Sequence, residues 1–465
     1  MGTDGALPAA SGRKNGMRWL LTALMAAFIG QSIFFGVHIT MDSREYINFG
    51  MLVYPLYPWF LALLRAVFGE SSYQMITILL QNVFLAWSIF SLLVYLQQEL
   101  ELKQRMVWVL ALTFFLSFMI QVVFVTSHFT ISNSIMSEGL TIPLYFLMFK
   151  HLHRGWNHKN VRDFWMCAFL TFLMISTRGQ LDWLLIPLAV LGIRICPLKK
   201  AGGETNRAVN ALFSIAVAGC VFAAAVLFIC TTNLIRNGSF HTTSTSSEVL
   251  AGNVFYCSSS EDADVFPEES TDRAAFEAVM DYAESNELTI EYADKSTLYS
   301  SFMHFGKTFN LLKGEIQYIL KNYTSEDPFA YMMELAMALL WRVRGKLAGH
   351  ILLNFYAGVI CSVAVYRPIF VPFALIFFAC CFLGILICRK LQILRKERSL
   401  LLMVLVLTFL NCFFVAFGVY AFNRYMFYNT PLLYISAELC AFALIRHLRT
   451  AKETGAETNG RPFKE

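Results

Sequence analysis

The chain has 465 residues, of which 57% are hydrophobic and only 15% are charged, and its mean hydropathy is +0.54. A water-soluble domain carries about 25% charged and about 45–50% apolar residues, so soluble globular and disordered proteins are excluded. The net charge of +5 is too small for a basic nucleic-acid binder. The remaining class is a polytopic membrane protein with the lipid bilayer as a partner.

Apolar runs of membrane-spanning length recur along most of the chain. A spanning helix needs about 20 largely apolar residues, and on this criterion the sequence predicts an all-α protein with about ten transmembrane helices. They are expected over residues 17–37, 73–96, 106–127, 135–152, 163–177, 180–196, 208–233, 368–388, 399–421 and 426–446.

Lys and Arg are concentrated in alternate connections, and this asymmetry predicts the orientation. With the N-terminus inside, the inner loops and both tails contain more than half of the 37 Lys and Arg residues. We therefore expect both termini in the cytoplasm of a bacterial cell and the chain in its plasma membrane. The predicted parts are a cytoplasmic tail (1–16), a membrane core (17–233) with a first outer loop (38–72), an extracytoplasmic insert (234–366), C-terminal transmembrane helices (367–446) and a cytoplasmic tail (447–465).

The insert is the one long polar segment, and its spacing predicts a small, mostly helical unit. Residues 254–256 (Val-Phe-Tyr) are expected to form one short strand. Residues 347–366 are apolar enough to span, but a span there would turn the basic loop at 389–398 outward. We therefore expect an interfacial or re-entrant helix over 347–366.

A polar cluster follows the first predicted span and contains His38, Asp42, Glu45 and Tyr46. Asp42, Glu45 and Tyr46 are spaced i, i+3 and i+4, so on a helix they share one face. A carboxylate there can act as a general base, as a metal ligand or only as a helix cap. Ionisable groups near membrane depth are costly, which makes them candidates for a functional site.

The rest of the first outer loop predicts a second short helix. Residues 54–58 read Tyr-Pro-Leu-Tyr-Pro and precede an apolar run of about 11 residues, too short to cross the bilayer. Proline is tolerated at helix starts but not in helix interiors. We expect two juxtamembrane helices between the first two spans.

This combination resembles the GT-C superfamily of polytopic membrane glycosyltransferases, which use polyprenyl-phosphate sugars in the manner of dolichyl-phosphate-mannose mannosyltransferases. The resemblance begins with an acid just outside the first span, a Tyr, and a Tyr-Pro-rich apolar helix. It continues at four further places: Ser137-Glu138, Thr177-Arg178, Arg424-Tyr425 and Pro431.

The resemblance implies roles for individual residues. Asp42 matches the acid that serves as catalytic base, and Arg178 and Arg424 match basic residues that hold the lipid phosphate. The other matched substrate-site positions are His38, Glu45, Tyr46, Glu138 and Tyr425.

The implied reaction is a transfer, with inversion, of a sugar from polyprenyl phosphate to an extracytoplasmic glycan, lipid or protein. A divalent cation stays open, because some relatives have two adjacent acids in the first loop, whereas Asp42 is followed here by Ser43.

Several plainer interpretations stay open beside this one. Arg178 and Asp182 can form a structural ion pair, and Arg424 can simply extend to the membrane interface. A transporter or flippase of lipid-linked sugars is a second function, although no internal repeat of the kind that transporters show is visible. A polysaccharide polymerase or ligase is a third, and a scaffolding protein is a fourth.

Overall fold

A computed structural model of the chain describes residues 8–50, 53–121, 130–195, 207–243, 245–325, 327–390, 394–421 and 423–459. These residues form α-helices and short 3-10 turns, and no β-strand occurs among them. An isolated bridge joins His38 to Ser134. The prediction of an all-α protein is therefore confirmed.

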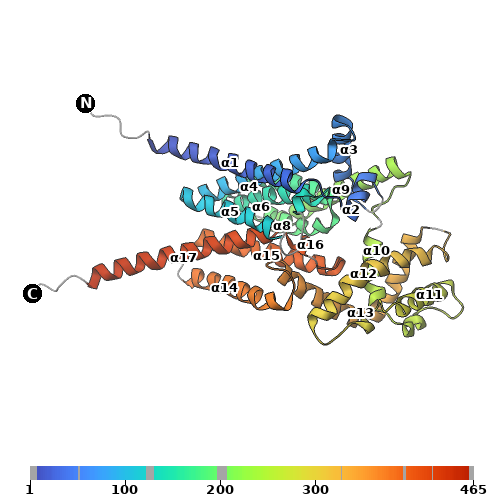
Figure 1. The fold of residues 1–465 in the computed structure, drawn as a ribbon. Helices are drawn as coiled ribbons and strands as arrows, with labels where there is room; N and C mark the ends of the chain where they lie inside the picture. The colour runs from blue at the N-terminus through green and yellow to red at the C-terminus, as the bar shows by residue number, and fades with distance from the viewer. Residues whose placement is uncertain are drawn as a thin grey trace, which may run out of the picture.

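Among the described residues, six helices are long and apolar enough to cross a membrane, judged by length and composition. They correspond to the first, second and last four predicted spans, and they run alongside one another in Figure 1. These helices are α1 (Pro8–Phe35), α4 (Tyr73–Glu99), α9 (Arg207–Asn237), α14 (Val371–Lys390), α15 (Arg395–Gly418) and α17 (Thr430–Asn459).

The third to sixth predicted spans also form helices, but these are shorter or more polar. Helix α8 has 11 residues and α7 has 17, which at 1.5 Å per residue gives about 17 and about 26 Å, less than a core of about 30 Å. For these four helices, spanning stays a prediction. Their bounds are α5 (Gln104–Gln121), α6 (Glu138–His158), α7 (Val161–Thr177) and α8 (Leu185–Ile195).

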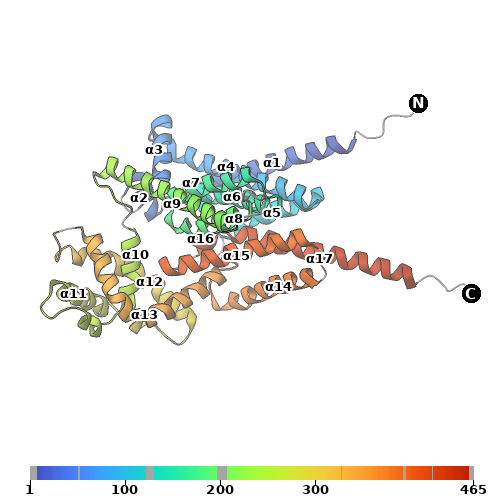
Figure 2. The same cartoon turned by 180° about the vertical axis from the view of Figure 1, so that it is seen from behind.

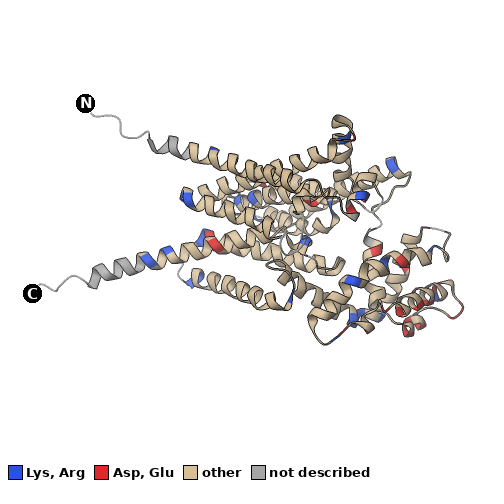
Figure 3. Cartoon of the chain, viewed as in Figure 1, with Lys and Arg blue, Asp and Glu red and all other residues tan. Residues whose placement is uncertain are grey.

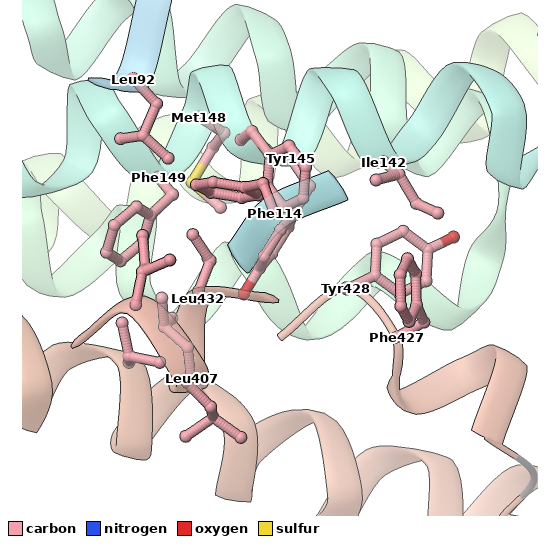
Figure 4. Packing of buried hydrophobic residues seen from close by; sticks show 14 of the residues in the cluster. Leu92, Phe114, Ile142, Tyr145, Met148, Phe149, Leu407, Phe427, Tyr428 and Leu432 are labelled. Atoms are coloured by element: carbon pink, nitrogen blue, oxygen red, sulfur yellow. The ribbon is translucent and has the colours of Figure 1, made fainter. Parts of the chain in front are cut away.

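Helix α6 lies at the centre of the bundle. Residues 141–149 are buried without exception, although Pro143 interrupts the backbone hydrogen bonds inside the helix. Protein surrounds this part of the helix, so it need not be as apolar as a lipid-facing one. Figure 4 shows its side chains packed between α4 and α5 on one side and the α15–α17 region on the other, at Leu92, Phe114, Ile142, Tyr145, Met148, Phe149, Leu407, Phe427, Tyr428 and Leu432.

A buried polar network fixes the start of the segment that leads into α6. The Gln31 amide donates to Thr130 Oγ1 at 2.8 Å and to Ser132 Oγ at 2.7 Å. Asn82 of α4 donates to the Asn133 side chain at 3.2 Å. Buried polar groups need such partners, so α1, α4 and η2 (Ile131–Asn133) are held in one register.

The first outer loop contains the two short helices that its sequence predicts, α2 (Met41–Asn48) and α3 (Leu56–Phe68). Thr40 caps α2 by accepting a hydrogen bond from the Ser43 N–H at 3.2 Å, and Ser43 Oγ accepts from the Thr40 N–H at 2.8 Å. The ring of Tyr46 meets Tyr57 edge to face at 5.1 Å. These contacts hold α2 against α3.

Four helices follow α9 and lie beyond one end of the long helices, as Figures 1 and 2 show from opposite sides. They have a hydrophobic core of their own, which includes Phe255, Phe276, Phe305 and Leu335. Their bounds are α10 (Thr245–Tyr256), α11 (Thr271–Ser285), α12 (Leu298–Leu320) and α13 (Pro328–Cys361). Short turns complete the chain: η3 (Gly179–Leu184), η4 (Ser260–Val265), η5 (Ile290–Tyr292), η6 (Pro368–Phe370) and α16 (Asn423–Met426).

Two local predictions differ from the structure. Residues 254–256 end helix α10 instead of forming a strand, because their apolar side chains pack into a helical core. Residues 347–361 are the last turns of the 34-residue helix α13, so no separate helix starts at 347. Asp327 caps α13, and Pro328 occupies its first turn.

Charges are distributed unevenly along the molecule. Figure 3 shows acids gathered on the α10–α13 unit, whereas few acids occur on the long helices. The beginning of α1 and the end of α17 point to the same end of the bundle, opposite to α2, α3 and α10–α13. We call these the basic end and the loop end.

Candidate functional site

Four charged residues from distant parts of the chain meet at the loop end of the bundle. They are Asp42 in the first turn of α2, Glu138 at the start of α6, Arg178 directly after α7, and Arg424 in α16. All four were candidates from the sequence. Their convergence is what makes this region the candidate site.

Glu138 is the centre of the cluster. Its side chain is fully buried, and its Oε1 lies 2.7 Å from Arg178 Nη1 and 2.6 Å from Arg424 Nε. Neither contact is aligned as a hydrogen bond to Oε1. One carboxylate oxygen therefore holds two guanidinium groups together by charge.

Arg424 connects the buried centre to the surface. Its Nη2 lies 2.6 Å from Asp42 Oδ2, and the Asp42 side chain is 48% exposed. The short helix α16 is anchored by Asn423, which donates to the carbonyls of Cys361 at 3.1 Å and Ala364 at 2.9 Å. Asp42 is the group of the cluster that solvent reaches most easily.

Arg178 is held by neutral partners as well as by Glu138. It donates through Nε to Gln180 Oε1 at 2.9 Å and through Nη1 to Ser137 Oγ at 3.2 Å. Its guanidinium lies over the Tyr425 ring at 4.9 Å. Gln180 in turn donates to the Tyr425 carbonyl at 3.2 Å, so the orientation of Arg178 is strongly constrained.

The alternative pairing of Arg178 with Asp182 does not occur. The carboxylate that pairs with Arg178 is Glu138, and one Asp182 oxygen is buried without a hydrogen-bond partner among the described residues. Asp182 lies near Tyr54 instead. Burial, together with the Asp182 charge, raises the pKa of the Tyr54 phenol to about 12.

Tyr46 closes the cluster from the α2 side. Its hydroxyl lies 2.9 Å from Ser137 Oγ. Burial raises its pKa to about 12, although the nearby Arg178 charge acts in the opposite direction. The phenol is therefore neutral at physiological pH and serves as a hydrogen-bonding group.

The capping interpretation of Asp42 is wrong, because Thr40 is the residue that caps α2. The predicted common face of α2 holds only in part. Tyr46 is buried in the cluster and Asp42 pairs with Arg424, whereas Glu45 is exposed and its carboxylate lies beside Gly50.

The other two predicted substrate-site residues, Tyr425 and His38, differ in the contacts that they make. Tyr425 stacks with both Arg178 and Arg424, with the latter at 5.2 Å. His38 uses its backbone to pair with the α6 approach, donating to Asn133 at 3.0 Å and accepting from Ile135 at 3.1 Å. The backbone of His38 is therefore fixed against the segment that leads into α6.

The sequence did not predict that Tyr54 and Gln180 belong to this region. It also did not predict that Ser137 contacts both Arg178 and Tyr46. Tyr54 packs so closely on Gly179 that a Cβ atom at Gly179 would overlap the phenol. The glycine directly after Arg178 was the available signal, since a residue without a side chain permits close approach.

A divalent cation does not fit the donor set of the cluster. Asp42 and Glu138 are both engaged by guanidinium groups, which repel a cation. Within the described ranges, no group of three or more His, Cys, Asp or Glu side chains is placed to hold a metal ion.

No protein-family model matches the chain, and no curated protein sequence matches it either. The interpretation of the site therefore depends on its residues and their geometry.

Proposed function

We propose that the chain is a membrane glycosyltransferase that moves a sugar from a polyprenyl-phosphate donor to a glycan, lipid or protein acceptor at the loop end. The observation that carries the proposal is the cluster itself: two guanidinium groups and a half-exposed carboxylate at one end of an apolar helix bundle. A lipid-linked phosphate arrives at such a place, because its tail stays in the bilayer while its head group lies at the surface.

The two arginines would bind the donor phosphate. A guanidinium presents a planar fork of N–H donors that matches phosphate oxygens. Glu138 holds both forks in place from the buried side, and Arg424 also pairs with Asp42. Donor binding would replace Asp42 at Arg424 by phosphate, which releases the carboxylate for its role in the reaction.

Asp42 would act as general base toward the acceptor hydroxyl. It is the exposed acid of the cluster, whereas Glu138 is fully buried between the arginines. A positioned base contributes about 10²–10⁴-fold to such a step. The neutral Tyr46 phenol would orient the site through Ser137 and take no proton.

The proposed step conserves atoms and charge. The acceptor oxygen attacks the anomeric carbon and its proton passes to Asp42. The bond between the anomeric carbon and the phosphate oxygen breaks, and its electron pair stays on the phosphate. Polyprenyl phosphate leaves with one more negative charge, which the two arginines stabilise. Asp42 then loses its proton to water.

The proposal is tested with purified protein in nanodiscs and a panel of polyprenyl-phosphate sugars. We expect release of polyprenyl phosphate with at least one donor, and loss of this release in Arg424→Gln but not in Asp281→Asn, an exposed acid of α11. If no donor is consumed while a lipid-linked sugar crosses the bilayer, a transporter or flippase replaces the enzyme. If donor is consumed equally by Arg424→Gln, the site assignment is wrong.

A further inference from the structure

A cavity lies between α4 and α6, toward the basic end and away from the charge cluster. Its volume is about 350 Å³, and its lining combines apolar and polar side chains of α4, the acid Glu99 among them, with basic side chains of α6. Lys150, in its wall, follows Glu138 by 12 residues on the same helix, or about 18 Å. The cavity therefore has no part in the site described above.

The two walls of the cavity differ in chemistry. Trp87, Phe90 and Val94 form an apolar strip along α4, and the Trp87 side chain is 45% exposed. Exposed apolar side chains on a membrane-spanning helix face lipid. The opposite wall carries Lys150 and Arg154, so one side suits an acyl chain and the other an anion.

Lys150 is the unusual cation of this wall. It is partly buried, and its ammonium group donates to Ser91 Oγ at 2.8 Å. Within the part of the chain that the structure describes, no carboxylate lies within 4.0 Å of it. A cation at this depth without a direct ion pair is costly, which favours an anion from the surroundings.

Its neighbours are already neutralised. Arg154 donates to both oxygens of Asp163, at 2.9 Å each through Nε, and His158 Nε2 lies 2.7 Å from Glu99 Oε2. The excess positive charge in the cavity therefore belongs to Lys150, while Arg154 adds a fixed guanidinium one turn away.

We propose that this cavity binds an anionic phospholipid of the leaflet at the basic end. The phosphate lies against Lys150 and Arg154, and one acyl chain follows the strip formed by Trp87, Phe90 and Val94. A phospholipid head group and free phosphate both present a phosphate anion to the two cations. The apolar strip favours the lipid as the ligand. The site is separate from glycosyl transfer and does not depend on it.

The test measures phosphatidylglycerol binding to delipidated protein in detergent by native mass spectrometry. Lys150→Met removes the attraction between the lysine and the anionic head group, so we expect phosphatidylglycerol to bind about fivefold more weakly to this variant. Lys150→Arg should retain the affinity. Lys103→Met is the matched control, because Lys103 is exposed on the α4–α5 connection and does not line the cavity.

Competition separates the possible ligands. Phosphatidylcholine should bind more weakly than phosphatidylglycerol, and inorganic phosphate should not displace the lipid at equal concentration. The proposal is overturned if Lys150→Met binds phosphatidylglycerol as tightly as the wild type, or if phosphatidylcholine binds equally well. Displacement by inorganic phosphate would overturn the lipid assignment in favour of a free-phosphate site.

Discussion

Glu138 is the buried carboxylate that compensates the charges of both arginines. Its side chain is fully buried, and Arg178 and Arg424 contact the same carboxylate oxygen. Glu138→Gln keeps the shape but leaves two buried guanidinium groups with Asp42 as their remaining acid. Removing one partner of a buried ion pair costs about 3–5 kcal/mol. We expect a clear fall in the thermal unfolding midpoint in detergent.

The control for that variant is an exposed pair. Lys346 Nζ lies 2.7 Å from Glu291 Oε1, and both side chains are more than 40% exposed. Lys346→Met should cost about 1 kcal/mol or less, because solvent screens the pair. Equal losses of stability in the two variants would contradict the central role assigned to Glu138.

At the residue scale, the sequence identified most members of the cluster but not their partners. Asp42 stood out because charged side chains are costly near a bilayer, and Glu138, Arg178 and Arg424 stood out through the family resemblance. Which acid pairs with which arginine depends on how helices far apart in the chain pack together, and the sequence contains no such distances. Asp182 was therefore one open partner for Arg178, while Glu138 is the observed one.

Helix α2 positions Asp42 through its capping box. Thr40→Val removes the side-chain acceptor for the Ser43 N–H and should cost about 1 kcal/mol. Because Asp42 lies in the first turn, we also expect donor turnover to fall by more than the loss of folded protein explains. The measurement is turnover per folded molecule.

The chain offers a matched control for this change. Thr297 and Ser300 form the same capping box at the start of α12. Thr297→Val should reduce stability by a similar amount and leave turnover per folded molecule unchanged. If both caps affect turnover alike, the positioning role of α2 is wrong.

Helix α10 contains a pH-sensitive acid outside the spanning helices. Burial raises the pKa of Glu248 above its ordinary value of 4.5, and the Lys313 ammonium group, 3.4 Å away, offsets only part of this rise. The folded state thus holds the proton more tightly than the unfolded one. Its contribution to stability is complete below pH 4.5 and is lost as the pH rises through the folded-state pKa.

Glu248→Gln should therefore stabilise the protein at neutral pH and have little effect below pH 4.5. The thermal unfolding midpoint, followed across this range in wild type and variant, measures the effect. Asp281→Asn, at an exposed position of α11, should show no such pH dependence. A stabilisation that is independent of pH would exclude the proposed linkage.

At the element scale, hydropathy predicted the helices that face lipid and was less informative for those surrounded by protein. Helix α6 is buried over residues 141–149 and needs no uniformly apolar surface. The hydropathy of its sequence therefore predicts a membrane span less strongly. Residues 254–256 were assigned to a strand, and 347–366 to a separate helix, because short apolar runs fit a strand, a membrane segment or a small core equally well.

At the scale of the whole molecule, the basic end and the acidic α10–α13 unit lie at opposite ends, as Figure 3 shows. From the excess of Lys and Arg near the termini we predict a cytoplasmic basic end. A fluorescent protein fused after residue 465 should fluoresce in bacterial cells. Alkaline phosphatase inserted after Asn286, in the turn that follows α11, should be active.

The opposite pattern of reporter activity would reverse the orientation and move the cluster to the cytoplasmic face. In that case a polyprenyl-phosphate donor would have to be used from the inner leaflet. A fluorescent protein inserted after Asn286 serves as the control, since it should fail to fluoresce if this turn is exported.

The most direct test of the central claim compares wild type with Asp42→Asn in release of polyprenyl phosphate from the donor that the wild type uses. The account predicts a loss of about 10²–10⁴-fold, with donor binding retained, because Arg178 and Arg424 remain paired with Glu138. An Asn variant that turns over donor as fast as the wild type would contradict the assignment of Asp42 as the base.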